Sequence, residues 1–211
     1  MKIFRNKKRI LVAIKPAGVL STDEPGGMPS LLRAQLGDDK ACVRTVHRLD
    51  AAVQGVMVFA RSAKAASLLS QQIRDRGFQK EYLAVVHGCP PPAGELCDLL
   101  GRDTARRITY VADAPGKDVR EAKLSYKVLK SCEGYSLVSI CLHTGRTHQI
   151  RVQFASRGWP LAGDRKYGTE DGFAQIALWS HRIAFTHPET GEAVEFSALP
   201  PQEGAWTMFS L

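Results

Sequence analysis

The stretch at residues 122–142, AKLSYKVLKSCEGYSLVSICL, constrains the fold most strongly. Apolar, aromatic and β-branched residues recur in both halves, and Glu133–Gly134 between them is typical of a turn, so the stretch predicts two strands joined as a hairpin. A second hairpin is predicted over residues 177–199, with its turn at PETGE. Strands joined by such short turns pair antiparallel.

Three more strands are expected from apolar runs. Residues 9–16 predict a strand that ends at Pro16, and residues 55–60 and 80–88 predict two others. Between these runs, residues 17–30 are rich in Gly and Pro and are expected to form a loop, while residues 89–95 resemble a linker.

The clearest helix covers residues 62–77. Ser62 can cap its start, and Gly77 is expected to end it. One face carries apolar residues at helical spacing: Ala65, Leu69 and Ile73. A shorter helix is expected over residues 147–158.

Strands therefore dominate and helices are few. This pattern predicts an α+β fold, with a mixed, largely antiparallel β-sheet flanked by a few helices and loops. We see no internal repeat and no obvious domain boundary, so a single domain over residues 1–211 is expected.

Composition narrows the class of protein. No apolar run approaches the roughly 20 residues of a membrane-spanning helix. Five cysteines form no CxxC pair, which favours reduced thiols over a disulfide framework or a zinc site. The net charge is +8, and the first 169 residues carry +13 because residues 170–211 are acidic. Such an excess suits a phosphate backbone, although it can also do no more than keep a protein soluble.

The HRLD segment at residues 47–50 indicates a function only when it is considered together with other segments of the chain. Taken alone, its Arg-x-Asp is typical of a structural ion pair. It is preceded by KPAGVLS and followed by KEYLAVVHG, HTGRTHQIRVQFASRGWPLAGDRKYG and LWSHRIAFTHPETGE. That ordered series, over residues 9–201, resembles the RluA family of RNA pseudouridine synthases. No S4-type RNA-binding segment is recognisable before residue 9, so the resemblance is to the short form that consists of the catalytic domain.

The resemblance implies an isomerase. Enzymes of this family break the N1–C1′ bond of a uridine in RNA, turn the base, and join C5 to C1′, with neither metal nor organic cofactor. The family's essential aspartate corresponds here to Asp50. It can attack C1′ as a nucleophile or remove the C2′ proton as a general base, and the sequence leaves both routes open.

Two further catalytic residues follow from the resemblance. Arg151 matches the arginine that pairs with the aspartate, and such a cation favours the ionised carboxylate. Without the motif, an exposed helix arginine would be the simpler interpretation. Tyr82 matches the tyrosine that stacks on the target base, and its alternative is an ordinary strand tyrosine packed in the core.

The target uridine must leave its stack to reach the aspartate. By resemblance, Arg48 helps to fill the space that the base leaves, since a guanidinium stacks on bases and bonds to them. His47 is expected beside the RNA as an organiser of the loop, and the remaining expected RNA contacts are Arg146, Thr147 and His148.

One departure from the family pattern raises an alternative. The family usually continues HRLD with two residues and then Thr-Ser-Gly, whereas this chain has Val53-Gln54-Gly55. A non-catalytic RNA-binding homologue is therefore a second hypothesis. A glycoside hydrolase that uses Asp164 as a second carboxylate is a third, although Asp164 is more simply expected to order its own turn.

The expected partner is structured rRNA or tRNA. The expected state is a cytoplasmic monomer without a membrane association. Which RNA and which uridine the chain recognises stays open.

Overall fold

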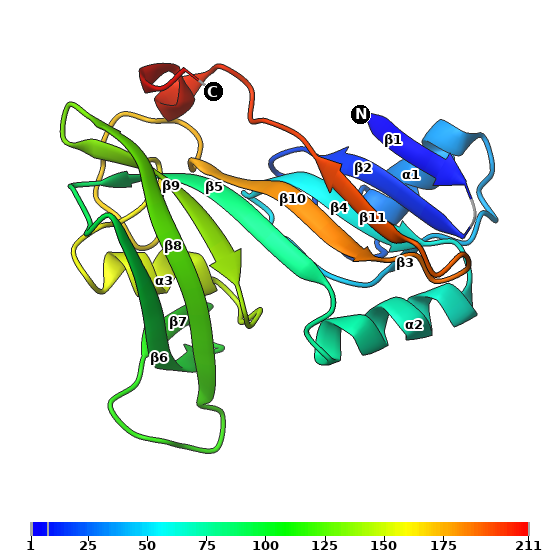
Figure 1. Ribbon diagram of the computed structural model, residues 1–211, viewed down its shortest axis with the longest axis horizontal. Helices are drawn as coiled ribbons and strands as arrows, with labels where there is room; N and C mark the ends of the chain where they lie inside the picture. Colours follow the sequence, from blue (N-terminus) through cyan, green and yellow to red (C-terminus); the bar gives the residue numbers. More distant parts are fainter. Residues whose placement is uncertain (1, 8, 211) are drawn as a thin grey trace. The chain divides into compact units, whose positions relative to one another are not determined.

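The computed structural model describes residues 2–7 and 9–210 (Figure 1). Contacts divide the chain into two compact units. Unit 1 comprises Met1–Lys80 and Trp179–Pro200, and unit 2 comprises Glu81–Leu178 and Pro201–Leu211. The single domain expected over residues 1–211 stays a prediction, and each unit is described by itself.

Unit 1 contains six strands and two helices of the described chain. The strands are β1 (Ile3–Lys7), β2 (Ile10–Lys15), β3 (Arg44–Thr45), β4 (Gln54–Ala60), β10 (Leu178–Thr186) and β11 (Ala193–Ser197). The helices are α1 (Met28–Leu36) and α2 (Ala63–Arg74). The strand order is β1-β2-β4-β10, with β11 beside β10 and β3 paired with the end of β4. β4 and β10 run parallel, and the other pairs in this unit are antiparallel.

The core of unit 1 lies between its sheet and α2. Alternate residues of a strand share one face, and here these residues of β2, β4 and β10 are buried: Ile10, Val12, Val56, Val58, Ile183 and Phe185. They form one cluster with Ala65 and Leu69 of α2, against which Ile73 also packs. The helix face predicted from the sequence is therefore confirmed.

The two ends of α2 differ in how well the sequence predicts them. Ser62 caps the start, because its Oγ accepts a hydrogen bond from the backbone N–H of Ala65 at 3.1 Å. The expected end at Gly77 is wrong: the helix stops at Arg74, and Arg76 takes the left-handed conformation with φ +61°. The backbone N–H of Gly77 then bonds back to the carbonyl of Gln72, at 2.8 Å, so the chain turns without needing a glycine at the left-handed position.

Gly55 of β4 is required by close packing of two strands. It lies opposite Ser180 of β10, and a Cβ at Gly55 would meet the Ser180 carbonyl oxygen at 2.4 Å. Its φ of +124° is also unfavourable for any residue with a side chain. The glycine that this chain shares with the family pattern thus allows β4 and β10 to approach one another.

Unit 2 is an antiparallel sheet with α3 against one side. Its strands are β5 (Gln79–His87), β6 (Ala93–Asp103), β7 (Ile108–Val111), β8 (Arg120–Cys132) and β9 (Tyr135–Leu142), in the order β5-β9-β8-β6-β7. α3 (Gln149–Ala155) packs through Val152 on Leu100 of β6 and Ala122 of β8. A short 3-10 helix, η1 (Gly204–Met208), ends the described chain.

Both predicted hairpins form, and the α+β class with a largely antiparallel sheet is confirmed. Glu133 and Gly134 take positive φ values of 51° and 79°, as the tight turn between β8 and β9 requires. The linker expected at residues 89–95 is partly wrong, because β6 already begins at Ala93. Helix α1 occupies the end of the expected loop at residues 17–30, and α3 is shorter than residues 147–158.

Candidate active site

The HRLD segment of unit 1 alternates between core and surface. His47 and Leu49 are buried, whereas Arg48 is exposed and Asp50 is partly exposed. The Nε2 atom of His47 accepts a hydrogen bond from the backbone N–H of Val58 in β4, at 3.0 Å. Burial, assisted by the charge of Lys80, lowers the pKa of His47 to about 3, so the imidazole is neutral. His47 therefore fastens the loop to the sheet.

Ser21 bonds the same loop from the other side. Its hydroxyl donates to the carbonyl of Leu49 at 2.7 Å and accepts the N–H of Leu49 at 3.0 Å. The carbonyl of Ser21 in turn accepts from the hydroxyl of Thr45 at 2.7 Å. The residue directly before Asp50 is thus fixed by both of its backbone polar groups.

Lys15 completes this support. Its side chain is fully buried, and Nζ donates to the carbonyls of Pro16 and Ala51, each at 2.9 Å. Burial lowers the pKa of Lys15 to about 8, and the nearby carboxylate of Asp50 partly opposes that shift. A buried cation therefore bonds to the residue after Asp50 and interacts with Asp50 itself. Sequence reasoning missed Lys15 and Ser21, although both stand in the KPAGVLS segment.

The pKa of Lys15 predicts a pH dependence of stability. Above about pH 8 the folded state releases this proton while the unfolded state keeps it to about pH 10.5, so stability rises with pH in this window. We expect the free energy of unfolding of the wild type, relative to Lys15→Met, to rise by up to about 3 kcal/mol across this window. Urea unfolding at a series of pH values measures it. The control is Lys64→Met, which changes an exposed lysine and should show no such rise. If the difference in the free energy of unfolding between wild type and Lys15→Met did not change with pH, the lowered pKa of Lys15 would be contradicted.

Of the two residues that replace the family's hydroxyls after HRLD, Val53 lies in the core and Gln54 is half-buried. Val53 is 2% exposed, so its methyl groups occupy a position where a threonine hydroxyl would need a buried partner. Its backbone N–H still donates to the carbonyl of Asp50 at 3.0 Å. The turn around Asp50 is therefore closed without the family's hydroxyls.

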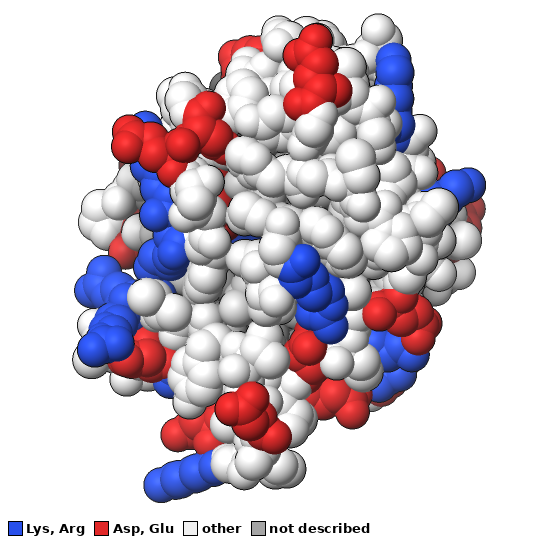
Figure 2. All heavy atoms as spheres, turned by 90° about the vertical axis from the view of Figure 1, so that its left-hand side faces the viewer, with Lys and Arg blue, Asp and Glu red and all other residues white. Residues whose placement is uncertain are grey.

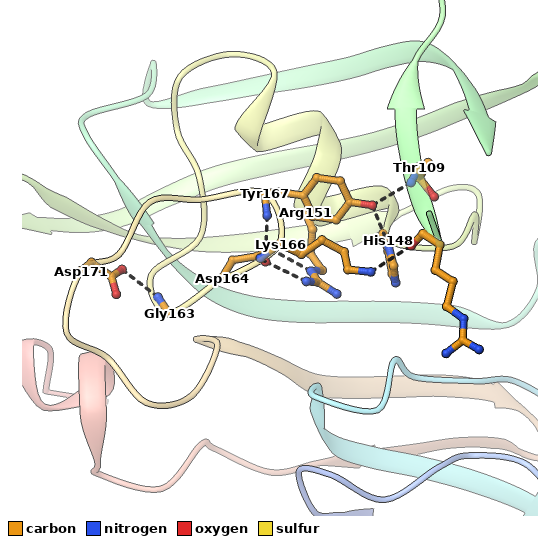
Figure 3. Close-up of polar contacts among 9 residues, drawn as sticks. Thr109, His148, Arg151, Gly163, Asp164, Lys166, Tyr167 and Asp171 are labelled. Carbon is orange, nitrogen blue, oxygen red and sulfur yellow. Dashed lines mark hydrogen bonds and ion pairs between the residues drawn. The ribbon is translucent and has the colours of Figure 1, made fainter. Parts of the chain in front are cut away.

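Arg151 of α3 in unit 2 forms a bidentate ion pair with Asp164 (Figure 3). Nε donates to Oδ2 at 2.8 Å and Nη2 donates to Oδ1 at 2.7 Å. Both residues are buried, at 7% and 1% exposure. Burial alone would raise the pKa of Asp164, but the hydrogen bonds and charge of Arg151 outweigh it and hold this pKa below its usual value. Asp164 also accepts the backbone N–H groups of Lys166 and Tyr167, so it orders its own turn as expected.

Tyr167 joins Arg151 to the segment before α3. The guanidinium of Arg151 lies 5.2 Å from the centre of the Tyr167 ring. The phenol oxygen accepts the backbone N–H of Thr109 at 2.8 Å and lies 2.7 Å from Nδ1 of His148, as Figure 3 shows. Burial raises the pKa of Tyr167, so the phenol stays protonated and can donate to His148.

Gln149 orders the rest of the segment. Its Oε1 accepts from the backbone N–H of Arg146 at 3.0 Å and from the hydroxyl of Thr144 at 2.8 Å. The carbonyl of Thr147 accepts the hydroxyl of Thr109 at 3.0 Å. Arg146 itself is exposed, so its guanidinium reaches the surface from a fixed backbone.

Residues 9–156 match the family model described as RNA pseudouridylate synthase. The chain belongs to this family. Pseudouridine synthases are isomerases that act on RNA. Among the described residues, no group of three or more His, Cys, Asp or Glu side chains is arranged to hold a metal ion. No described helix is both long and apolar enough to span a membrane.

Individual relatives agree with this membership. The uncharacterized RNA pseudouridine synthase YlyB of Bacillus subtilis is 33% identical over 217 residues, which cover 97% of this chain and 71% of that protein. Ribosomal large subunit pseudouridine synthase D of Neisseria meningitidis is 33% identical and covers 92% of this chain, but the match spans only 56% of that relative's length. The human RNA pseudouridylate synthase domain containing 1 has the same fold, with a TM-score of 0.81, 23% identity, and coverage of 97% of this chain and 85% of that chain.

The residues expected at the pseudouridine synthase site fall in both units. Unit 1 holds His47, Arg48 and Asp50, and unit 2 holds Tyr82, Arg146, Thr147, His148 and Arg151. Within unit 2, His148 and Arg151 meet at Tyr167, while Tyr82 lies buried on β5. The pairing of Asp50 with Arg151 stays a prediction. Asp164, the second carboxylate of the glycoside hydrolase hypothesis, is committed to Arg151, which removes the basis of that hypothesis.

Proposed function

We propose that this chain converts uridine to pseudouridine in RNA, with Asp50 as the essential carboxylate. The observation that carries the proposal is that hydrogen bonds hold the backbone on both sides of Asp50, in a chain that belongs to the pseudouridine synthase family. Leu49 and Ala51, its two neighbours, are bonded to the buried Ser21 and Lys15. A reacting group needs such a fixed backbone, because small misplacements cost much of the rate.

The proposed reaction needs Asp50 to be ionised. As a nucleophile, the carboxylate attacks C1′ while the N1–C1′ bond breaks; as a base, it takes the C2′ proton. In either route the base turns, C5 bonds to C1′, and C5 loses its hydrogen. The cation of Lys15 lies close enough to Asp50 for the two charges to interact.

Arg151 is the proposed ion-pair partner of Asp50. Asp164 engages the Nε–Nη2 edge of the guanidinium, and Tyr167 lies against its face. These contacts fix where Arg151 can present its charge, which supports a role in positioning a second carboxylate.

The remaining residues are proposed to hold the RNA. Tyr82 would stack on the flipped base, and Arg48, which is exposed beside Asp50, would fill the space that the base leaves. His47 acts indirectly by fastening the loop to β4. Contacts to the strand near the target are assigned to Arg146, Thr147 and His148.

The proposed substrate is structured rRNA or tRNA, and the proposed setting is the cytoplasm. We further propose that the chain works as a monomer without a metal or organic cofactor. The relative named ribosomal large subunit pseudouridine synthase D supports rRNA as the first substrate to test.

The test is release of tritium from RNA labelled at C5 of uridine, with rRNA and tRNA transcripts assayed separately. Release must accompany isomerisation, because C5 exchanges its hydrogen for the bond to C1′. We expect release from at least one pool. Binding of both pools without release would reject the enzyme and leave the RNA-binding homologue.

A further inference from the structure

Unit 2 contains a pocket of about 260 Å³ that no proposed catalytic step uses. Three of its lining residues are arginines, namely Arg102, Arg120 and Arg146. Thr109 and Thr147 contribute to its wall, and Asp118 is the single carboxylate that lines it.

Strand register explains why the arginines meet. Leu100 of β6 pairs with Arg120 of β8, and Arg102 of β6 pairs with Thr109 of β7. Alternate residues of a strand share a face, so all four side chains lie on one side of the sheet. Leu100 packs under α3 by way of Val152. Arg102, Thr109 and Arg120 lie on the same side of the sheet as Leu100.

Backbone carbonyls orient two of these cations without neutralising them. Arg146 donates from Nε to the carbonyl of Glu121 at 2.9 Å, which leaves its terminal amino groups for a ligand. Arg120 donates from Nη1 to the carbonyls of Lys117 and Val119, each at 2.8 Å. Within the described part of the chain, none of the three arginines forms an ion pair.

The pocket therefore carries an excess of positive charge. In Figure 2, which faces the left-hand side of Figure 1, one group of Lys and Arg side chains lies at the left margin, with Asp and Glu side chains beside it, and other cations are scattered over the face. Guanidinium groups bind phosphate oxygens strongly, because their planar N–H donors match the geometry of the phosphate. A pocket of this size and charge suits one phosphate group.

The pocket also adjoins the Arg151 cluster. Thr109 lines the pocket, and its backbone N–H donates to the phenol oxygen of Tyr167, which contacts Arg151. Thr147 shares the same wall through the hydrogen bond from Thr109 to its carbonyl. A ligand in the pocket would lie next to residues assigned to the reaction.

We propose that this pocket binds a backbone phosphate of the RNA strand that carries the target uridine. Capture of this phosphate sets the register of the strand relative to the Arg151 cluster, which the pocket adjoins. This inference rests on the proposed function, because it takes RNA as the substrate. It adds Arg102 and Arg120 to the RNA-binding residues, neither of which stands in a family motif segment.

Arg102→Ala tests the proposal by salt dependence. Each phosphate contact contributes roughly 0.7–0.9 to the slope of log affinity against log salt. We expect Arg102→Ala to lower that slope by about one contact, weaken RNA binding by about tenfold, and raise KM with little change in kcat. Arg102→Lys, which keeps the charge, should keep the slope.

Matched controls separate the pocket from general charge. Lys130→Ala removes one exposed cation from the same strand as Arg120, ten residues further along, and should change neither slope nor KM. Asp118→Asn removes the pocket's carboxylate and should tighten binding severalfold. A slope for Arg102→Ala equal to that of Lys130→Ala, or weaker binding by Asp118→Asn, would overturn the proposal.

The two proposals fail differently. Absence of tritium release by the wild type would reject the isomerase, while the salt slopes would still be measured by binding alone. Normal release combined with unchanged slopes would reject only the phosphate pocket.

Discussion

Asp50→Asn is expected to reduce tritium release from C5-labelled uridine by at least about 10⁴-fold while leaving RNA affinity within about twofold. A carboxamide can neither attack C1′ nor accept the C2′ proton, so both routes are lost together. The fold around it should persist, because Ser21 and Lys15 form hydrogen bonds with the backbone of Leu49 and Ala51, the residues on either side of Asp50. Single-turnover release and filter binding on the same RNA measure the two effects.

The matched control is Asp39→Asn, which changes an exposed carboxylate of the same unit. It should release tritium at the wild-type rate. If RNA affinity collapsed in Asp50→Asn, Asp50 would be a structural residue of the binding surface; if turnover persisted, another group would carry the chemistry. Either result would reject the assignment.

Asp164→Ala should lower the free energy of unfolding by about 3–5 kcal/mol, because it removes the carboxylate that accepts two hydrogen bonds from the buried guanidinium of Arg151. It also removes the acceptor for the backbone N–H groups of Lys166 and Tyr167. Turnover should fall as well, with kcat affected more than KM, since Arg151 loses the contact that orients it. Urea unfolding and steady-state kinetics measure these effects.

The control for Asp164→Ala is Glu195→Ala. Glu195 pairs with Arg182 at 2.6 Å, but its side chain is 51% exposed, so its loss should destabilise the protein far less than the loss of Asp164. Asp164→Asn keeps one acceptor oxygen for the turn, and its loss of stability should lie between those of Asp164→Ala and Glu195→Ala. Equal losses for Asp164→Ala and Glu195→Ala would show that the buried pair does not stabilise unit 2.

The stabilisation by Asp164 should also depend on pH. Arg151 holds the pKa of Asp164 below its usual value, so the unfolded state takes up this proton first as the pH falls. The contribution is complete above the ordinary carboxyl pKa of about 3.9 and is lost as the pH approaches the lower folded value. The stability difference between wild type and Asp164→Asn should therefore narrow in acid.

Much of the fold could be predicted from local patterns. The turn residues Glu133–Gly134 predict the hairpin of β8 and β9. The N-cap residue Ser62 and one apolar face predict α2. β6 escaped prediction because its residues, AGELCDLLGRD, mix Gly and acidic side chains with apolar ones. Such a strand is stabilised by its neighbours β7 and β8 rather than by its own propensity. The end of α2 was missed because Arg76 adopts a conformation that favours glycine.

The amino-acid sequence by itself determined the family, because its motif segments stand in an order that can be read along the chain. It also predicts Asp50, Tyr82 and Arg151 as the residues that carry the chemistry, since each stands in one of these segments. Only the tertiary structure decided what supports them. Lys15 bonds to Ala51 across 36 residues, and the phenol of Tyr167 meets Thr109 across 58. Contacts at such separations arise from strand register and burial, which no local pattern records. The same register brings Arg102 and Arg120 to the pocket that Arg146 also lines.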